Sequence, residues 1–258
     1  MDEKWRNDLD NIMKAENVLS DKDLYELKNY LYNNMAFDEN QPNRRIPRKD
    51  GKDFPIYNFL PKENKPKNLL EKYIVGMMGG QPHHIEYWMR YNDALQWHID
   101  SDEIVERTAG LKITHTLEYP ISSYVFHVDV ENVTGGELQI APFDKRNTKS
   151  LTIEDYEPKN GAKILTIPPV SNQVISWGGP IYHRVLEQHT GKRLCLIWSL
   201  WKEIPKGFKK GLHWKPSTIH EPVWNVERFI EGGPAATETT TANDFIVAQV
   251  EWPIKEDL

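Results

Sequence analysis

The sequence has almost no cysteine. Its 258 residues include a single one, Cys195, which excludes an intrachain disulfide framework and a metal site built from thiolates. Long hydrophobic runs are also missing, because no apolar stretch approaches the roughly 18 to 20 residues of a membrane span. The first ten residues, MDEKWRNDLD, lack the basic and apolar regions of a signal peptide. We therefore expect a cytoplasmic protein that has no membrane partner.

Positive charge is in deficit. The chain carries 32 Lys and Arg against 38 Asp and Glu, a formal net charge of −6, which disfavours an extended nucleic-acid surface and leaves room only for a local basic pocket. Apolar residues make up 39% and charged residues 27%, which is typical of a globular chain with a buried core. The composition thus argues against nucleic-acid binding and against disorder.

Aromatic residues, by contrast, are abundant, with 9 Trp, 11 Tyr and 8 Phe, as expected for a β-rich core. From residue 84 onward, short runs rich in β-branched and aromatic residues are separated by Gly, Pro and Asn, which favours a sandwich or barrel. These runs are HIEYWMRY, SSYVFHVDV, GELQIAP, AKILTIPP, NQVISW and KRLCLIWSLW. Strands and helices do not alternate there, which argues against a parallel α/β sheet.

The first third of the chain is predicted to be helical. Ser20 and Asp23 have the spacing of a capping box at the start of one helix, and a second helix is expected over residues 67–78, ended by Gly79 and Gly80. We therefore divide the chain into an N-terminal helical support region packed on the core (1–83), a β core (84–205) and a C-terminal extension (206–258).

Two His-x-Asp tripeptides are candidates for metal ligation. His98 and Asp100 lie in QWHIDSDE, and His127 and Asp129 lie in FHVDVEN. On a strand this spacing places both side chains on one face, so that an imidazole and a carboxylate can bind a common metal ion. The tripeptides by themselves do not decide between the two pairs.

A third element lies near the end of the β region. His183 precedes a predicted strand in which Arg193, Cys195 and Ile197 share one face. An arginine on such an apolar face requires an anionic partner, either a buried acidic residue or a bound carboxylate that fits the guanidinium fork. Two histidines, one carboxylate and this arginine predict a redox-iron site that takes a carboxylate cosubstrate.

Three segments together, RYNDALQWHID, VFHVDVENVTGGELQIAP and VISWGGPIYHRVLEQHTGKR, resemble the Fe(II)/2-oxoglutarate-dependent dioxygenases and are most similar to their prolyl 4-hydroxylase-like branch. The resemblance covers roughly residues 84–201. It implies a mainly β fold, a double-stranded β-helix (jelly-roll) core behind N-terminal helices. It also implies Fe(II), 2-oxoglutarate as cosubstrate and O2, in a reaction that couples oxidative decarboxylation to hydroxylation of a C–H bond.

The resemblance implies that His98, Asp100 and His183 bind the iron. In the family a pair of strands separates the His-x-Asp ligands from the Gly-Gly turn. His98 stands 37 residues before Gly135, whereas His127 stands only 8 residues before it. An aspartate at position 100 also argues against halogenase chemistry, in which related enzymes carry a small residue there.

The same resemblance implies residues that bind the cosubstrate. Arg193 is expected to hold the far carboxylate of 2-oxoglutarate, and His127 and Tyr91 are candidate hydrogen-bond donors to it. Leu138 is expected to line the same pocket. For His127 and Tyr91, an ordinary role within their strands remains the alternative.

The expected substrate is a peptidyl-prolyl or amino-acid-like molecule, so the partner is a small molecule or a peptide. One alternative is a non-catalytic, cupin-like metal-binding jelly roll, which the Gly-x-Arg context of Arg193 disfavours. An oxidative nucleic-acid demethylase is disfavoured because Ser199 stands where those relatives carry a second arginine. The sequence leaves open the substrate itself, the oligomeric state and the roles of residues 142–168 and of the C-terminal extension.

Overall fold

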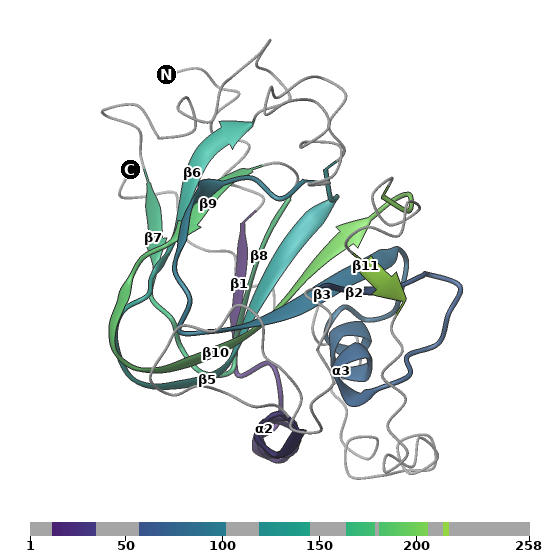
Figure 1. Cartoon of the computed structure of the whole chain (residues 1–258), viewed down its shortest axis with the longest axis horizontal. Helices are drawn as coiled ribbons and strands as arrows, with labels where there is room; N and C mark the ends of the chain where they lie inside the picture. Colours follow the sequence, from purple (N-terminus) through teal and green to yellow (C-terminus); the bar gives the residue numbers. More distant parts are fainter. Residues whose placement is uncertain are drawn as a thin grey trace.

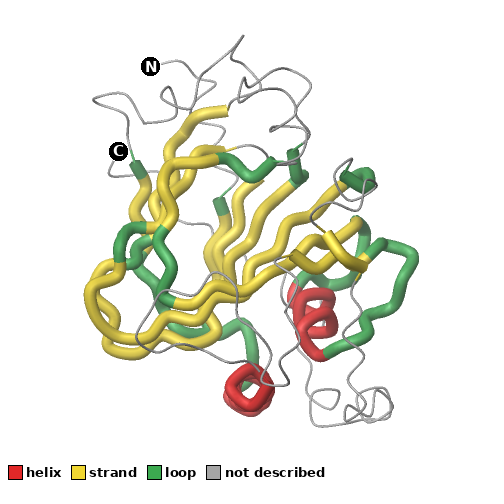
Figure 2. The backbone as a smooth tube through the Cα atoms, viewed as in Figure 1, coloured by secondary structure: helices red, strands yellow, loops and turns green. Residues whose placement is uncertain are grey.

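The computed structural model describes residues 12–34, 57–101, 119–144, 164–178, 181–205 and 214–216. These residues form two β-sheets, and two helices lie on the outer side of the larger one (Figure 1; the tube in Figure 2 separates helices from strands). The prediction of a mainly β chain with N-terminal helices is confirmed.

The larger sheet has seven strands, in the spatial order β1-β8-β5-β10-β3-β2-β11. Neighbouring strands are antiparallel except for β11 and β2, which are parallel. Their bounds are β1 Met13–Glu16, β2 Tyr57–Leu60, β3 His84–Tyr91, β5 Ser122–Gly135, β8 Gln173–Gly178, β10 Gln188–Trp201 and β11 Trp214–Pro216.

The smaller sheet has four antiparallel strands in the order β4-β9-β6-β7. They are β4 Leu95–His98, β6 Leu138–Asp144, β7 Leu165–Ile167 and β9 Ile181–Val185. From β3 to β10 the chain passes back and forth between the two sheets, with β3, β5, β8 and β10 in the larger one. This path makes a double-stranded β-helix, the jelly-roll core that was expected.

Both predicted helices form. In α2 (Asp21–Asn34), the Ser20 hydroxyl accepts the Asp23 backbone N–H at 3.2 Å, which is the first contact of the predicted capping box. The same hydroxyl donates to the Asp23 carboxylate at 2.7 Å. In α3 (Leu69–Met77), the Asn68 side chain accepts the N–H of Glu71 at 2.9 Å.

The region before residue 84 is not only helical, because β1 and β2 lie within it and belong to the larger sheet. Each of these strands has four residues, too few for an alternating pattern to be recognised in the sequence. Their position is fixed by pairing with β8 and β3. The N-terminal region therefore extends the core sheet as well as covering it.

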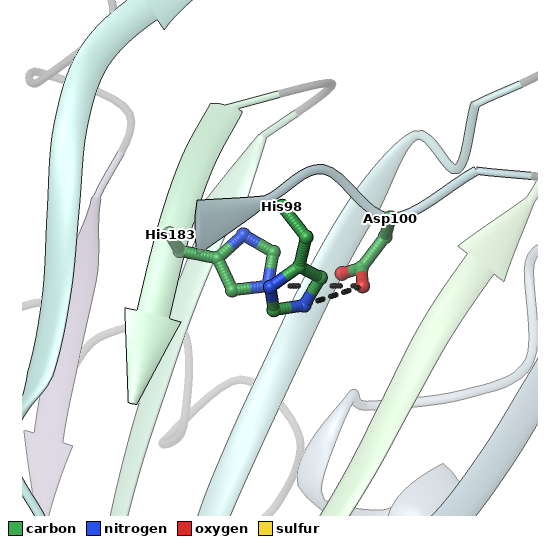
Figure 3. A group of neighbouring side chains, drawn as sticks. All are labelled: His98, Asp100 and His183. Carbon is green, nitrogen blue, oxygen red and sulfur yellow. Dashed lines mark ion pairs between the residues drawn. The ribbon is translucent and has the colours of Figure 1, made fainter. Parts of the chain in front are cut away.

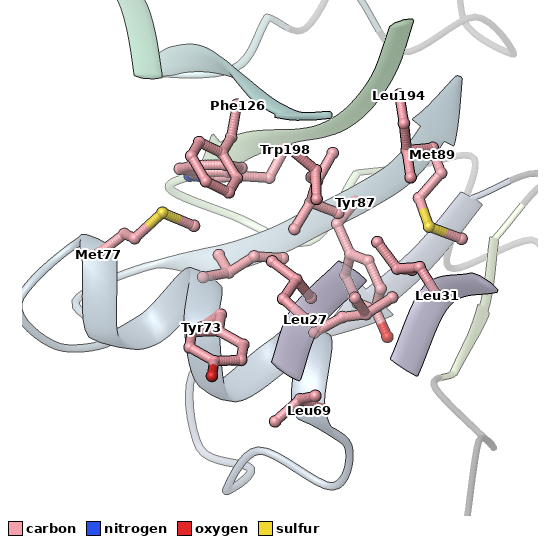
Figure 4. Packing of buried hydrophobic residues seen from close by; sticks show 14 of the residues in the cluster. Leu27, Leu31, Leu69, Tyr73, Met77, Tyr87, Met89, Phe126, Leu194 and Trp198 are labelled. Carbon is pink, nitrogen blue, oxygen red and sulfur yellow. The ribbon is translucent and has the colours of Figure 1, made fainter. Parts of the chain in front are cut away.

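The two helices bury the outer face of the larger sheet (Figure 4). On β10, alternate residues face this cluster: Leu194, Leu196, Trp198 and Leu200. Leu27 and Leu31 of α2 and Ile74 of α3 pack against them and are fully buried, each contributing about 1.5–3 kcal/mol by leaving water. The intervening residues of β10 face the space between the sheets, where the candidate site lies.

Most of the predicted C-terminal extension and of residues 142–168 lies outside the described residues. Within the described part of the chain, no helix is long and apolar enough to span a bilayer.

Candidate metal centre

His98, Asp100 and His183 converge between the two sheets (Figure 3). His98 ends β4 and lies directly opposite His183 of β9, while Asp100 follows β4 by two residues. The Asp100 Oδ1 atom is 3.8 Å from His98 Nε2 and 3.7 Å from His183 Nε2. One ligand atom from each of the three residues lies within 4.8 Å of the others, so the structure brings together the three predicted metal ligands.

Hydrogen bonds to the backbone fix which nitrogen of each imidazole is available. His98 Nδ1 is 2.7 Å from the Gln96 carbonyl, and His183 Nδ1 is 3.0 Å from the Ile181 carbonyl. A carbonyl only accepts, so each Nδ1 carries the proton and each Nε2 keeps its lone pair. Both lone pairs therefore belong to the atoms that approach Asp100.

The Asp100 carboxylate is held from the far side. The Ser123 hydroxyl of β5 donates to Asp100 Oδ2 at 2.6 Å and lies 3.1 Å from the Ser199 hydroxyl of β10. Both serines are fully buried. Oδ2 is thus engaged by the protein, and Oδ1 is left facing the two histidines.

Burial lowers the pKa of His98 to about 3, helped by the neighbouring His183 and opposed by Asp100. Burial alone would raise the pKa of Asp100, but the His183 and His98 imidazoles, the Ser123 hydroxyl and the Arg90 charge outweigh it and hold that pKa low. At neutral pH, His98 is therefore a neutral donor and Asp100 an anion, the forms in which these groups bind a metal ion.

The metal-ligand candidates open onto a pocket whose lining also includes Arg193, His127 and Leu138. Three predicted cosubstrate residues therefore share one cavity with the triad. Val125 and Ile197 supply apolar walls between them.

The Arg193 guanidinium is buried, and its hydrogen-bond acceptors among the described residues are all neutral. Nε donates to Gln188 Oε1 at 3.2 Å, Nη1 to the Gly136 carbonyl at 3.0 Å, and Nη2 to the Asp93 carbonyl at 2.5 Å. Its backbone N–H donates to Asn92 Oδ1 at 2.7 Å. Among the described residues no carboxylate pairs with it, so its charge remains available to an anionic ligand.

His127 is buried in the same pocket, with 1% of its surface exposed. Burial, together with the Arg193 charge, lowers its pKa to about 3. Its Nδ1 atom has no hydrogen-bond partner within the described part of the chain. The pocket thus presents a neutral imidazole next to a guanidinium.

Tyr91 is placed differently from the expectation. It is fully buried in the cluster that contacts the helices, in the row that pairs with Leu194, and it is not among the pocket residues. On β3 the pocket-facing residues are Trp88 and Arg90. Tyr91 has the opposite parity, because successive side chains of a strand point to opposite faces, and the assignment of Tyr91 to the cosubstrate is corrected accordingly.

The second His-x-Asp pair is split between the two faces of its sheet. His127 pairs with Cys195 and Asp129 with Leu194, so the register shifts by one residue between them. Asp129 consequently faces α2, where Lys28 Nζ lies 2.5 Å and the Tyr32 hydroxyl 2.7 Å from its carboxylate. His127 and Asp129 therefore do not share a site.

Residues that the sequence reasoning did not assign also line the pocket. They are Trp88, Arg90, Asp93, Leu95, Val125, Trp177, Val185, Cys195 and Ile197. Only the pairing of β3 with β10 selects Trp88 and Arg90 over their neighbours. The sequence HIEYWMRY predicts a strand whose alternate residues face opposite sides, but it does not say which of the two sets faces the pocket.

No protein-family model and no curated protein matches the chain. Among solved structures, it is similar to a 2OG-Fe(II) oxygenase family oxidoreductase from Burkholderia pseudomallei, with 10% identity, 78% of this chain and 90% of that chain covered, and a TM-score of 0.46. A prolyl-4-hydroxylase from Pseudomonas putida has 13% identity, 76% and 98% coverage, and a TM-score of 0.43. HygX from Streptomyces hygroscopicus, with nickel, 2-oxoglutarate and hygromycin B bound, has 12% identity, 77% and 86% coverage, and a TM-score of 0.42.

Proposed function

We propose that the protein is an Fe(II)- and 2-oxoglutarate-dependent oxygenase that hydroxylates a C–H bond. The observation that carries this proposal is one pocket that holds both a two-histidine, one-carboxylate triad and a buried guanidinium, which within the described part of the chain is bonded to neutral acceptors alone. Two imidazoles and one carboxylate on one side of an ion are the ligand set of non-haem Fe(II) oxygenases, which leaves open positions for other ligands.

The donor set fits a divalent ion. The two Nε2 atoms have their lone pairs free, and Asp100 offers Oδ1 while Ser123 keeps Oδ2. Ligands at about 2.1 Å from one ion lie about 3 to 3.5 Å from each other, so the distances of 3.7 and 3.8 Å need close by only a few tenths of an ångström. The residues present therefore suit the metal that the sequence motif implies.

Charge balance supports a dianionic ligand beside that metal. Arg90 and Arg193 are offset by Asp93 and Asp100, so the pocket's formal charge is zero when the imidazoles are neutral. A divalent ion adds two positive charges, and a dicarboxylate removes them again. Arg193 would hold one carboxylate of 2-oxoglutarate through its fork, while His127 would supply a further polar contact and Leu138 an apolar wall.

A bound iron ion would supply the redox chemistry through which O2 is reduced. In the overall reaction, 2-oxoglutarate, O2 and R–H yield succinate, CO2 and R–OH, one oxygen atom entering succinate and the other the product. The protein's own residues position the reactants: Ser123 orients Asp100, the Gln96 and Ile181 carbonyls hold the imidazoles, and the buried walls exclude water.

The substrate is proposed to be a peptidyl-prolyl or amino-acid-like molecule, on the strength of the sequence motifs. The test supplies purified protein with Fe(II), 2-oxoglutarate and O2, together with a panel of peptides and free amino acids. We expect succinate formation and a mass increase of one oxygen atom in the substrate, both lost in Arg193→Ala. Metal binding without succinate formation under any condition would instead favour a cupin-like binding module.

A further inference from the structure

Arg90 is a second guanidinium in the pocket, and the proposed function gives it no role. It lies directly opposite Cys195 of β10, which in turn lies opposite His127 of β5. The three residues form one row across the larger sheet, and all three line the pocket. Arg193 lines it two residues further along β10.

The described residues accept hydrogen bonds from only part of the Arg90 guanidinium. Its Nη1 forms an ion pair with Asp93 Oδ2. Its Nε is buried and has no hydrogen-bond acceptor among the described residues. A buried guanidinium N–H without an acceptor is unfavourable, and a ligand oxygen in the same pocket would relieve that cost.

The two arginines occupy different parts of the pocket. Ser199, which contacts Ser123 beside Asp100, stands four residues along β10 from Cys195, the partner of Arg90, and six residues from Arg193, so Arg90 lies nearer the triad. Asp93 lies between them, with its carboxylate on Arg90 and its backbone carbonyl on Arg193. The pocket thus has a guanidinium on the metal side and another on the far side.

We propose that Arg90 binds the carboxylate of the cosubstrate that lies at the metal triad, so that the two arginines hold the two ends of one dicarboxylate. This inference rests on the proposed function, in which the dicarboxylate is 2-oxoglutarate. It makes Arg90 responsible for the 2-oxo acid end, which is common to all 2-oxo acids, and Arg193 responsible for the far carboxylate.

Two ligands separate these contributions. 2-Oxopentanoate has the same five-carbon chain and 2-oxo acid end as 2-oxoglutarate but lacks the far carboxylate. Each ligand is titrated into Mn(II)-loaded protein, and the dissociation constant is measured by calorimetry or from the fluorescence of Trp88 and Trp177, which line the pocket. Binding is thus measured independently of turnover.

Arg90→Gln should weaken both ligands by the same factor, about tenfold to a hundredfold for one lost charge-assisted hydrogen bond. Arg193→Gln should weaken 2-oxoglutarate by a similar factor and leave 2-oxopentanoate unchanged. The matched control is Arg184→Gln, because Arg184 contacts Trp97 and Gln139 and is not a pocket residue. It should change neither affinity.

A single substitution at Arg90 leaves the buried Asp93 carboxylate unpaired, so the double variant Arg90→Gln/Asp93→Asn is measured alongside it. This variant removes both charges and keeps the Asp93 carbonyl that Arg193 contacts, and it should also lose 2-oxopentanoate affinity. Unchanged affinities for both ligands would overturn the proposal. A loss confined to 2-oxoglutarate would overturn it as well, because Arg90 would then act only through Arg193. If the wild type binds neither ligand, the proposed function itself fails.

Discussion

Two stretches of this chain share the pattern His-x-Asp and have different structures. His98 and Asp100 stand at the end of β4, where both side chains reach one metal site. His127 and Asp129 stand inside β5, where only the histidine faces the pocket and the aspartate pairs with α2. Both stretches had been expected to present both side chains on one face of a strand.

The difference comes from a β-bulge. Between His127 and Asp129 the pairing with β10 slips by one residue, and an extra residue in one strand reverses the parity of everything after it. Val128 and Asp129 both face the helices as a result. Asp100 has no such constraint, because it lies beyond the last paired residue of β4. The same tripeptide is therefore a metal-ligand pair only where the strand pairing allows it.

The largest expected effect concerns the ligands of the first pair. Asp100→Ala and His98→Ala should each abolish turnover and weaken metal affinity by more than about a hundredfold, since each leaves two ligands where the site needs three. His127→Ala should keep the metal. Anaerobic titration with Fe(II) or Mn(II) measures both. Loss of metal by His127→Ala and its retention by His98→Ala would mean that the wrong pair has been assigned to the metal.

The next effect concerns Arg193, whose charge lies beside His127 of the second pair. Arg193→Ala should weaken 2-oxoglutarate binding by about 2–5 kcal/mol, because the ligand carboxylate would be buried without a partner. Arg193→Lys should lose less, since it keeps the charge but not the planar fork. The 2-oxoglutarate dependence of succinate formation reports both. If the alanine variant saturates at the wild-type concentration, Arg193 has only a structural role.

The aspartate of the second pair should affect stability and not metal binding. Asp129→Ala removes the partner of Lys28 and Tyr32, and we expect a loss of about 2–3 kcal/mol in the free energy of unfolding. Denaturant unfolding of the metal-free protein measures this loss. Metal affinity should equal that of the wild type, whereas weaker metal binding would indicate that the bulge does not separate the two faces.

The histidine of the second pair should have a modest effect on the cosubstrate. His127→Ala should weaken 2-oxoglutarate binding by about 1.5–2 kcal/mol, or roughly tenfold to thirtyfold, for one hydrogen bond to a charged group. Calorimetry on the Mn(II)-loaded variant provides the measurement. An unchanged dissociation constant would assign His127 to the pocket wall alone.

A separate effect of the same histidine is a pH dependence of stability. His127 has a pKa of about 3 in the folded protein, below the usual 6.5, so between these values the unfolded chain binds a proton that the folded one does not. Stability should therefore fall as the pH falls from 6.5 toward 3, with this residue contributing about 1.4 kcal/mol per pH unit. His127→Leu should flatten the slope by that amount relative to the wild type, in unfolding curves recorded across this range. An identical slope in both proteins would show that His127 is protonated in the folded state.

Patterns local in the sequence predicted most of the elements. The Ser20 cap, the two helices and the long strands followed from spacing and composition, since capping and strand alternation are short-range effects. The strands β1, β2, β9 and β11 were not predicted, because strands of three to five residues acquire their hydrogen bonds from partners distant in the chain.

For the candidate site, the family resemblance carried by the ordered motifs predicted the residues that converge, namely His98, Asp100 and His183, with Arg193, His127 and Leu138 in the same pocket. These residues are far apart in the chain, and the path of the jelly roll brings them together in one pocket. Tyr91 was assigned to the wrong face of its strand. A β-run gives two alternating sets of side chains but does not say which set faces inward.

The sequence by itself thus determined the kinds of residues, their order and the class of fold, because these depend on composition and local periodicity. Only the tertiary structure decided which face each strand residue occupies. The register of β10 against β3 and β5 placed Arg90 in the pocket, Tyr91 behind it and Asp129 on α2. Register is set by long-range pairing and by one bulge, and a shift of a single residue moves a side chain from one face of a sheet to the other.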